Sequence, residues 1–166
     1  MLNYASRLQA ALFWKYVMTE KLAWVLLTTI SPISELRGGM WLGIVTFRLD
    51  PLLIFFIAVI ANILIFFPVF FALRFFYDKL LYRIPLFDKY LDNLRKRGKP
   101  KVEKYGFWGL TLFVAIPLPI TGAYTGTILA WLLGMDWRKA FPAVGLGIIV
   151  AGVIVLLITL GATSTL

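Results

Sequence analysis

The chain of 166 residues is 61% hydrophobic and 15% charged, with a mean hydropathy of +0.87. A soluble domain of this length usually has about 45–50% apolar and about 25% charged residues, so this composition excludes a small soluble core and indicates a lipid environment. Because the sequence contains no Cys and no His, we expect no disulfide, no metal site and no cofactor.

The N-terminal residues 1–20 are mixed polar and apolar and predict a short helix of weak amphipathicity lying at the membrane interface. The aromatic side chains Trp14, Tyr16 and Trp24 are typical of the headgroup level.

Residues 22–47 are apolar but interrupted at 31–39 by the sequence SPISELRGG. These 26 residues are too few for two full crossings, which need about 40. Glu35 and Arg37 at mid-depth would also be costly against lipid. We therefore predict a re-entrant hairpin, with a half-helix in, a broken tip and a half-helix out. The alternative is one kinked, tilted crossing.

The first full transmembrane helix is predicted over 51–76, with Asp50 as its N-cap and Pro51 at its first position. The linker 77–104 holds nine basic and four acidic residues, a net charge of +5. It contains an amphipathic surface helix and should be cytoplasmic, since basic loops beside membrane spans usually set orientation. We favour this over nucleic-acid binding and expect no nucleic-acid partner.

The second half repeats this plan. Residues 106–135 are uncharged, and their 30 positions are too long for one upright span and too short for two. A break over 116–122 predicts a second re-entrant hairpin. The polar turn at 136–139, with Asp136 as a cap, leads into a final transmembrane helix over 137–163.

An internal repeat relates the two halves. An offset of 87 residues aligns 31–44 with 118–131, with identities at Pro32/Pro119, Ile33/Ile120, Gly39/Gly126 and Leu42/Leu129. Each half has one hairpin and one crossing, so the second half enters from the opposite face and the two tips can meet near the midplane. The sequence thus predicts one membrane domain over 1–166, an all-α integral membrane protein with an antiparallel, inverted-topology repeat. Both termini are then external.

The two tip motifs, over 31–39 and 117–126, resemble those of the small multidrug export family, a compact relative of the DedA/VTT superfamily. The likeness extends from about Leu22 to Thr159. The wider superfamily implies proton-linked transport or scrambling of lipids. DedA proteins typically carry Arg in the second hairpin, where this sequence has Thr121 and Tyr124.

Glu35 is the leading candidate for proton coupling, with Arg37 as the anion partner. The alternative is a structural pair that holds the hairpin in place. Predicted substrate-binding residues are Ser34, Thr121, Tyr124 and Asn62, although Asn62 in mid-span suits an interhelical hydrogen bond better. The tip residues that shape the backbone are predicted to be Pro32, Gly38, Gly39, Pro117, Pro119, Gly122 and Gly126.

These features predict a multi-pass cell-membrane transporter, coupled to protons, that moves a lipid-like or amphipathic substrate through a midplane site. The alternative is an uncoupled lipid scramblase or a membrane-shaping protein. An enzyme is not expected, because the sequence offers no His, no Cys and no acidic cluster for a metal. The expected partners are membrane lipids, the substrate and a second copy that shields the tip backbone.

Overall fold

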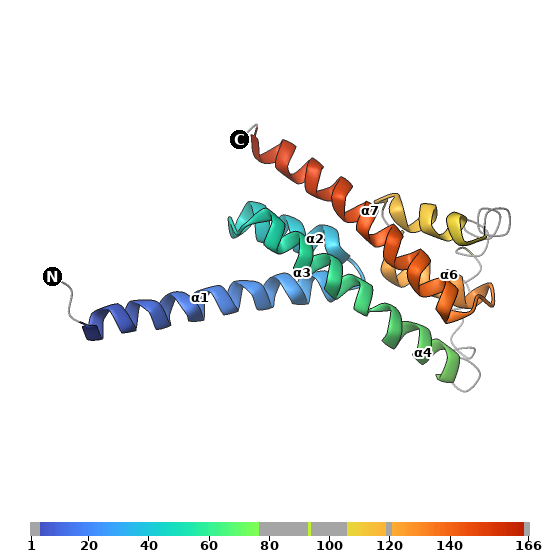
Figure 1. Cartoon of the computed structure of the whole chain (residues 1–166), viewed down its shortest axis with the longest axis horizontal. Coiled ribbons are helices and arrows are strands. Elements are labelled where there is room, and N and C mark those ends of the chain that lie inside the picture. The colour runs from blue at the N-terminus through green and yellow to red at the C-terminus, as the bar shows by residue number, and fades with distance from the viewer. Residues whose placement is uncertain (1–3, 77–92, 94–105, 119–120, 165–166) are drawn as a thin grey trace.

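The computed structural model describes residues 4–76, 93, 106–118 and 121–164, and every regular element within these ranges is helical. The predicted linker helix lies almost wholly outside the described residues. The helices form two halves, each with a helical hairpin followed by a helical stretch of membrane-spanning length (Figure 1).

The first helix, α1 (Tyr4–Ile30), is continuous over 27 residues. The predicted boundary between an interfacial helix over 1–20 and a hairpin starting at 22 is therefore absent, because no Gly or Pro interrupts the sequence there. The N-terminal part of α1 projects away from the other helices (Figure 1). Its large side chains are exposed there, among them Phe13 and Trp14.

The chain reverses at residues 31–34, and α2 (Glu35–Trp41) packs back against α1. Residues 22–47 are thus not one straight helix. The helices come close at Gly39, where a Cβ atom would lie 3.1 Å from the Val25 carbonyl oxygen and closer still to Thr29. The hairpin ends in a π-helix, η1 (Leu42–Thr46), a rare form that often marks functional segments.

The first long helix has two parts, α3 (Pro51–Leu64) and α4 (Phe66–Phe76). The predicted N-cap is confirmed, since the Asp50 carboxylate accepts a hydrogen bond from the Leu53 N–H at 2.8 Å, with Pro51 at the first position. The interruption at Ile65 follows from Pro68, which has no N–H to donate to the preceding turn. Residues 51–76 are long and apolar enough to cross a membrane.

The second half contains the short helix Gly106–Ala115, unlabelled in Figure 1, then α6 (Ala123–Leu132) and α7 (Trp137–Ser164). A Cβ atom on Gly126 would overlap the Val114 side chain, so the two short helices are in close contact. Asp136 precedes α7 and accepts a hydrogen bond from the Arg138 N–H at 3.0 Å, which confirms the predicted capping role.

The longest apolar helix, α7, packs against α2, α3, α4 and α6. It runs antiparallel to α3 and α4: the Phe66 and Phe67 rings meet Phe141 near the start of α7, whereas Val59 lies beside Gly152 further along it. Two antiparallel helices of membrane-spanning length therefore form the centre of the described structure (Figure 1).

Candidate functional site

Glu35 occupies an unusual backbone position at the start of α2. Its φ is +48°, a left-handed conformation that is uncommon for a residue with a long side chain. The turn around it is held by hydrogen bonds from the Glu35 N–H to the Ser31 carbonyl at 2.9 Å and from the Ser34 hydroxyl to the Thr28 carbonyl at 2.6 Å. Such strain persists only where surrounding contacts enforce it, and it clusters at functional sites.

The Glu35 side chain is buried, with 7% of the residue exposed, and it reaches the other hairpin. Its Oε1 accepts a hydrogen bond from the Tyr124 N–H at 3.4 Å, in the first turn of α6. Free N–H groups and the helix dipole make this end of a helix favourable for a negative charge. The carboxylate of one half therefore lies at the helix N-terminus of the other half.

Gly122, the N-cap of α6, makes this approach sterically feasible. A Cβ atom there would overlap the Glu35 carboxylate. The backbone of Gly122 is extended, with φ −171° and ψ −158°, so space rather than backbone conformation requires a glycine. The absence of a side chain at residue 122 lets the carboxylate contact the start of α6.

Two further hydrogen bonds connect the tips. Arg37 donates from Nη2 to the Thr121 carbonyl at 2.6 Å, and the Tyr124 hydroxyl donates to the Ile30 carbonyl. Together with the bond to Glu35, they link the residues that flank both turns. We call this group, formed by Ile30, Glu35, Arg37, Thr121 and Tyr124, the tip junction.

The hydroxyl groups of Ser34 and Thr121, two of the four predicted substrate-binding residues, bond within their own turns. Ser34 donates to Thr28, as described above, and Thr121 donates to the Ile116 carbonyl at 2.6 Å and accepts from the Leu118 N–H at 3.1 Å. Both side chains stabilise the bends between half-helices. Only the backbone carbonyl of Thr121 takes part in the tip junction.

Asn62 lies next to the junction rather than in it. It is fully buried on α3, and its Nδ2 donates to the Thr29 carbonyl at 3.2 Å, in the last turn of α1. This is the kind of interhelical hydrogen bond that the sequence analysis favoured for Asn62. Asn62 Oδ1 is the one buried side-chain polar atom without a hydrogen-bond partner in the part of the chain that the structure describes.

The predicted tip residues fall at the reversals or at close helix contacts. Pro32 and Pro117 lie in the two turns, and Gly38 lies beside Ser34, where a Cβ atom would be 2.5 Å from the Ser34 Cβ. Gly39, Gly122 and Gly126 are the close-contact positions described above. Pro119 lies outside the described residues.

Sequence reasoning missed three features of this site. The acceptor role of the Ile30 carbonyl and the left-handed φ of Glu35 leave no pattern in residue types. The contact between Glu35 and Gly122 did leave a signal, because an offset of 87 residues relates these two positions directly.

The fold and the site define a class of protein. Two antiparallel helices of spanning length and a buried polar junction between two helical hairpins are features of an all-helical membrane protein. A family model described as "Putative small multi-drug export protein" matches residues 35–154, and the chain belongs to this family. The description is that of a membrane exporter. Neither the curated proteins nor the solved structures include a match to the chain.

Proposed function

We propose that the protein is a proton-coupled membrane transporter that moves a lipid-like or amphipathic substrate through the tip junction. The observation that carries this proposal is the buried carboxylate of Glu35 at the N-terminus of α6, which belongs to the opposite half of the chain. The family description, an exporter, agrees with transport as the general activity.

The chemistry of the junction suggests how a proton would act on it. Ionised Glu35 is attracted to the N–H groups and the dipole of α6. A proton on the carboxylate removes that charge and weakens the attraction, so the two tips separate more readily. The start of α6 and the Arg37 guanidinium are then free to receive the polar head of a substrate, because both favour anionic or hydrogen-bond-accepting groups.

The arrangement of equivalent residues supports an inverted repeat around this site. Gly39 and Gly126 correspond under the offset of 87 residues, and each lies at the close contact between the two helices of its hairpin. Glu35 and Gly122 correspond and touch each other, as expected for positions beside a two-fold axis between the halves. Transporters with inverted repeats place their substrate sites at such junctions of broken helices.

The experiment is pH-driven transport in proteoliposomes that contain the purified full chain. An inward or outward proton gradient is imposed, and movement of NBD-labelled phosphatidylglycerol and of ethidium is followed by fluorescence. We expect gradient-dependent movement of at least one probe by the natural protein, and its loss in Glu35→Gln with the fold retained. Failure of the natural protein to move either probe faster than empty liposomes contradicts the proposal.

Glu20→Gln is the matched control, because Glu20 is an exposed carboxylate on α1, outside the tip junction. It should transport as the natural protein does. If Glu35→Gln also keeps full gradient dependence, Glu35 does not couple the proton, and movement without any gradient in both proteins would instead favour a lipid scramblase.

A further inference from the structure

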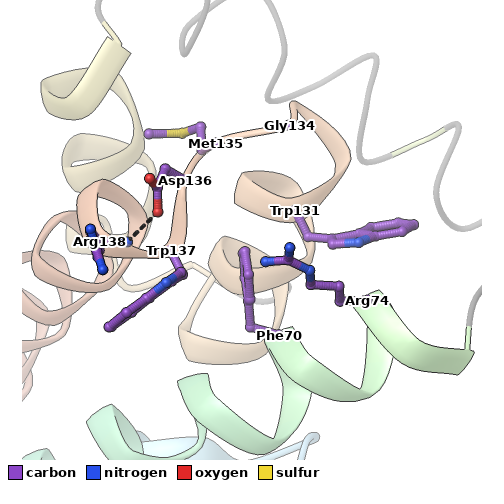
Figure 2. A pocket seen from close by; sticks show the side chains of 8 residues that line it. All are labelled: Phe70, Arg74, Trp131, Gly134, Met135, Asp136, Trp137 and Arg138. Atoms are coloured by element: carbon purple, nitrogen blue, oxygen red, sulfur yellow. Dashed lines mark hydrogen bonds between the residues drawn. The ribbon is translucent and has the colours of Figure 1, made fainter.

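A second polar site lies at the end of the two long helices, away from the tip junction. A pocket of about 460 Å³ is lined by side chains from the end of α4, the end of α6, and the turn into α7 (Figure 2). We call it the α4/α7 pocket; it is lined by Phe70, Arg74, Trp131, Gly134, Met135, Asp136, Trp137 and Arg138.

The charge of the α4/α7 pocket is positive. Arg74 and Arg138 both line it, and Figure 2 shows them on opposite sides of the group of lining residues. Among the lining residues that the structure describes, Asp136 is the one acidic side chain, and its Oδ1 already accepts the Arg138 backbone N–H at 3.0 Å as the cap of α7. The described lining thus has two arginines against one carboxylate, which favours an anionic ligand.

The position of the pocket indicates a lipid as the source of that anion. Arg74 is in the last turn of the first long helix and Arg138 is in the first turn of the second, the positions at which a membrane-spanning helix would meet water. Trp131 and Trp137 line the same pocket, and tryptophan is enriched at the headgroup level. The Arg138 guanidinium is 5.6 Å from the centre of the Trp137 ring, a cation–π geometry.

A second pocket, at the opposite end of the long helices, is less positively charged. A pocket of about 400 Å³ at the opposite end is lined by Ile44, Val45, Arg48, Leu49, Pro51, Leu160 and Thr163. Four of these positions, 44, 48, 49 and 51, correspond under the 87-residue offset to 131, 135, 136 and 138. Among their described lining residues, the related pocket has one cation where the α4/α7 pocket has two, and it has no tryptophan.

From this geometry we propose that the α4/α7 pocket binds the phosphate-bearing headgroup of an anionic membrane lipid. The lipid bound there is distinct from the substrate at the tip junction, since none of the lining residues belongs to that junction. The sequence that follows α4, residues 77–104, has a net charge of +5, which favours the same anionic leaflet.

The test is lipid-dependent thermal stability of the full chain in a neutral detergent. Phosphatidylglycerol is titrated against phosphatidylcholine, and inorganic phosphate and glycerol 3-phosphate are titrated separately. Phosphatidylglycerol should raise the melting temperature in a saturable way, and phosphatidylcholine should not. The two soluble phosphates should give no shift at the same concentrations, because they lack the acyl chains that bring the headgroup to the interface.

Arg74→Gln and Arg138→Gln should each raise the concentration of phosphatidylglycerol needed for half of the shift about fivefold. Lys139→Gln is the matched control: it removes an exposed cation next to Arg138 that does not line the pocket, and it should leave the titration unchanged. Melting temperatures measured without added lipid show whether each variant still folds.

Three results overturn the proposal. The first is an equal shift with phosphatidylcholine, and the second is an equal effect of Lys139→Gln and the two pocket variants. The third is a shift produced by soluble phosphate alone, which would make the pocket a site for a free anion. The measurement needs no transport, so its outcome is independent of the function proposed for Glu35.

Discussion

At the scale of single residues, the contact between Glu35 and Gly122 is the most constrained feature of the tip junction. The carboxylate is buried, comes from a residue with a left-handed φ, and touches a glycine of the opposite half. The sequence singled out Glu35 and Arg37 as candidates, because charged groups predicted to lie at membrane depth are costly and therefore informative. It could not identify their acceptors and donors, which are backbone groups and carry no side-chain signature.

Gly122→Ala should destabilise the protein, because the new methyl group overlaps the Glu35 carboxylate. We expect a loss of about 1–3 kcal/mol in the free energy of unfolding, measured by denaturation in detergent. Adding Glu35→Ala should recover most of this loss, since it removes the overlapping atoms. Gly161→Ala is the control, as a Cβ atom there has no neighbour within 4 Å. An unchanged stability in Gly122→Ala would mean that the two tips are not in contact.

At the scale of elements, the breaks were easier to predict than the continuous stretches. Pro32, Pro117 and the caps Asp50 and Asp136 marked the reversals and helix starts, because proline and capping side chains act within one turn. The end of the expected N-terminal helix near residue 20 was wrong, since a change from mixed to apolar composition does not by itself end a helix. The π-helix at residues 42–46 has no such local marker.

The close contact between helix Gly106–Ala115 and α6 gives a prediction at this scale. Gly126→Ala should lower the melting temperature in detergent, because a Cβ atom on residue 126 overlaps the Val114 side chain. The double variant with Val114→Ala should regain stability by opening that space, as residues in contact do not act additively. Gly145→Ala, on α7 with no neighbour within 4 Å, should be tolerated. Equal losses in the single and double variants would contradict the packing.

At the scale of the whole molecule, the predicted membrane topology depends on the antiparallel arrangement of the two long helices. If both hairpins are re-entrant, each half crosses the membrane once, and the two termini lie on the face opposite to the turn before α7. From the net charge of the linker 77–104 we predict that this turn is cytoplasmic.

Labelling of single cysteines tests this topology, because the natural chain has none. Lys15→Cys and Ser164→Cys should react with a membrane-impermeant maleimide in intact cells, and Lys139→Cys should react only after permeabilisation. All three positions are exposed. Reaction of Lys139→Cys and Ser164→Cys from the same side would contradict one crossing in the second half.

By itself, the sequence determined that the chain is an all-helical membrane protein of the small multidrug export family, because apolar excess, helix length and local breakers act over short distances along the chain. Its wider likeness to the DedA/VTT superfamily stays a prediction. Only the tertiary structure decided that Glu35 lies at the start of α6, that Arg37 reaches the Thr121 carbonyl, and that two arginines from different halves share one pocket. These contacts join residues more than 60 positions apart, and their geometry depends on how whole helices pack.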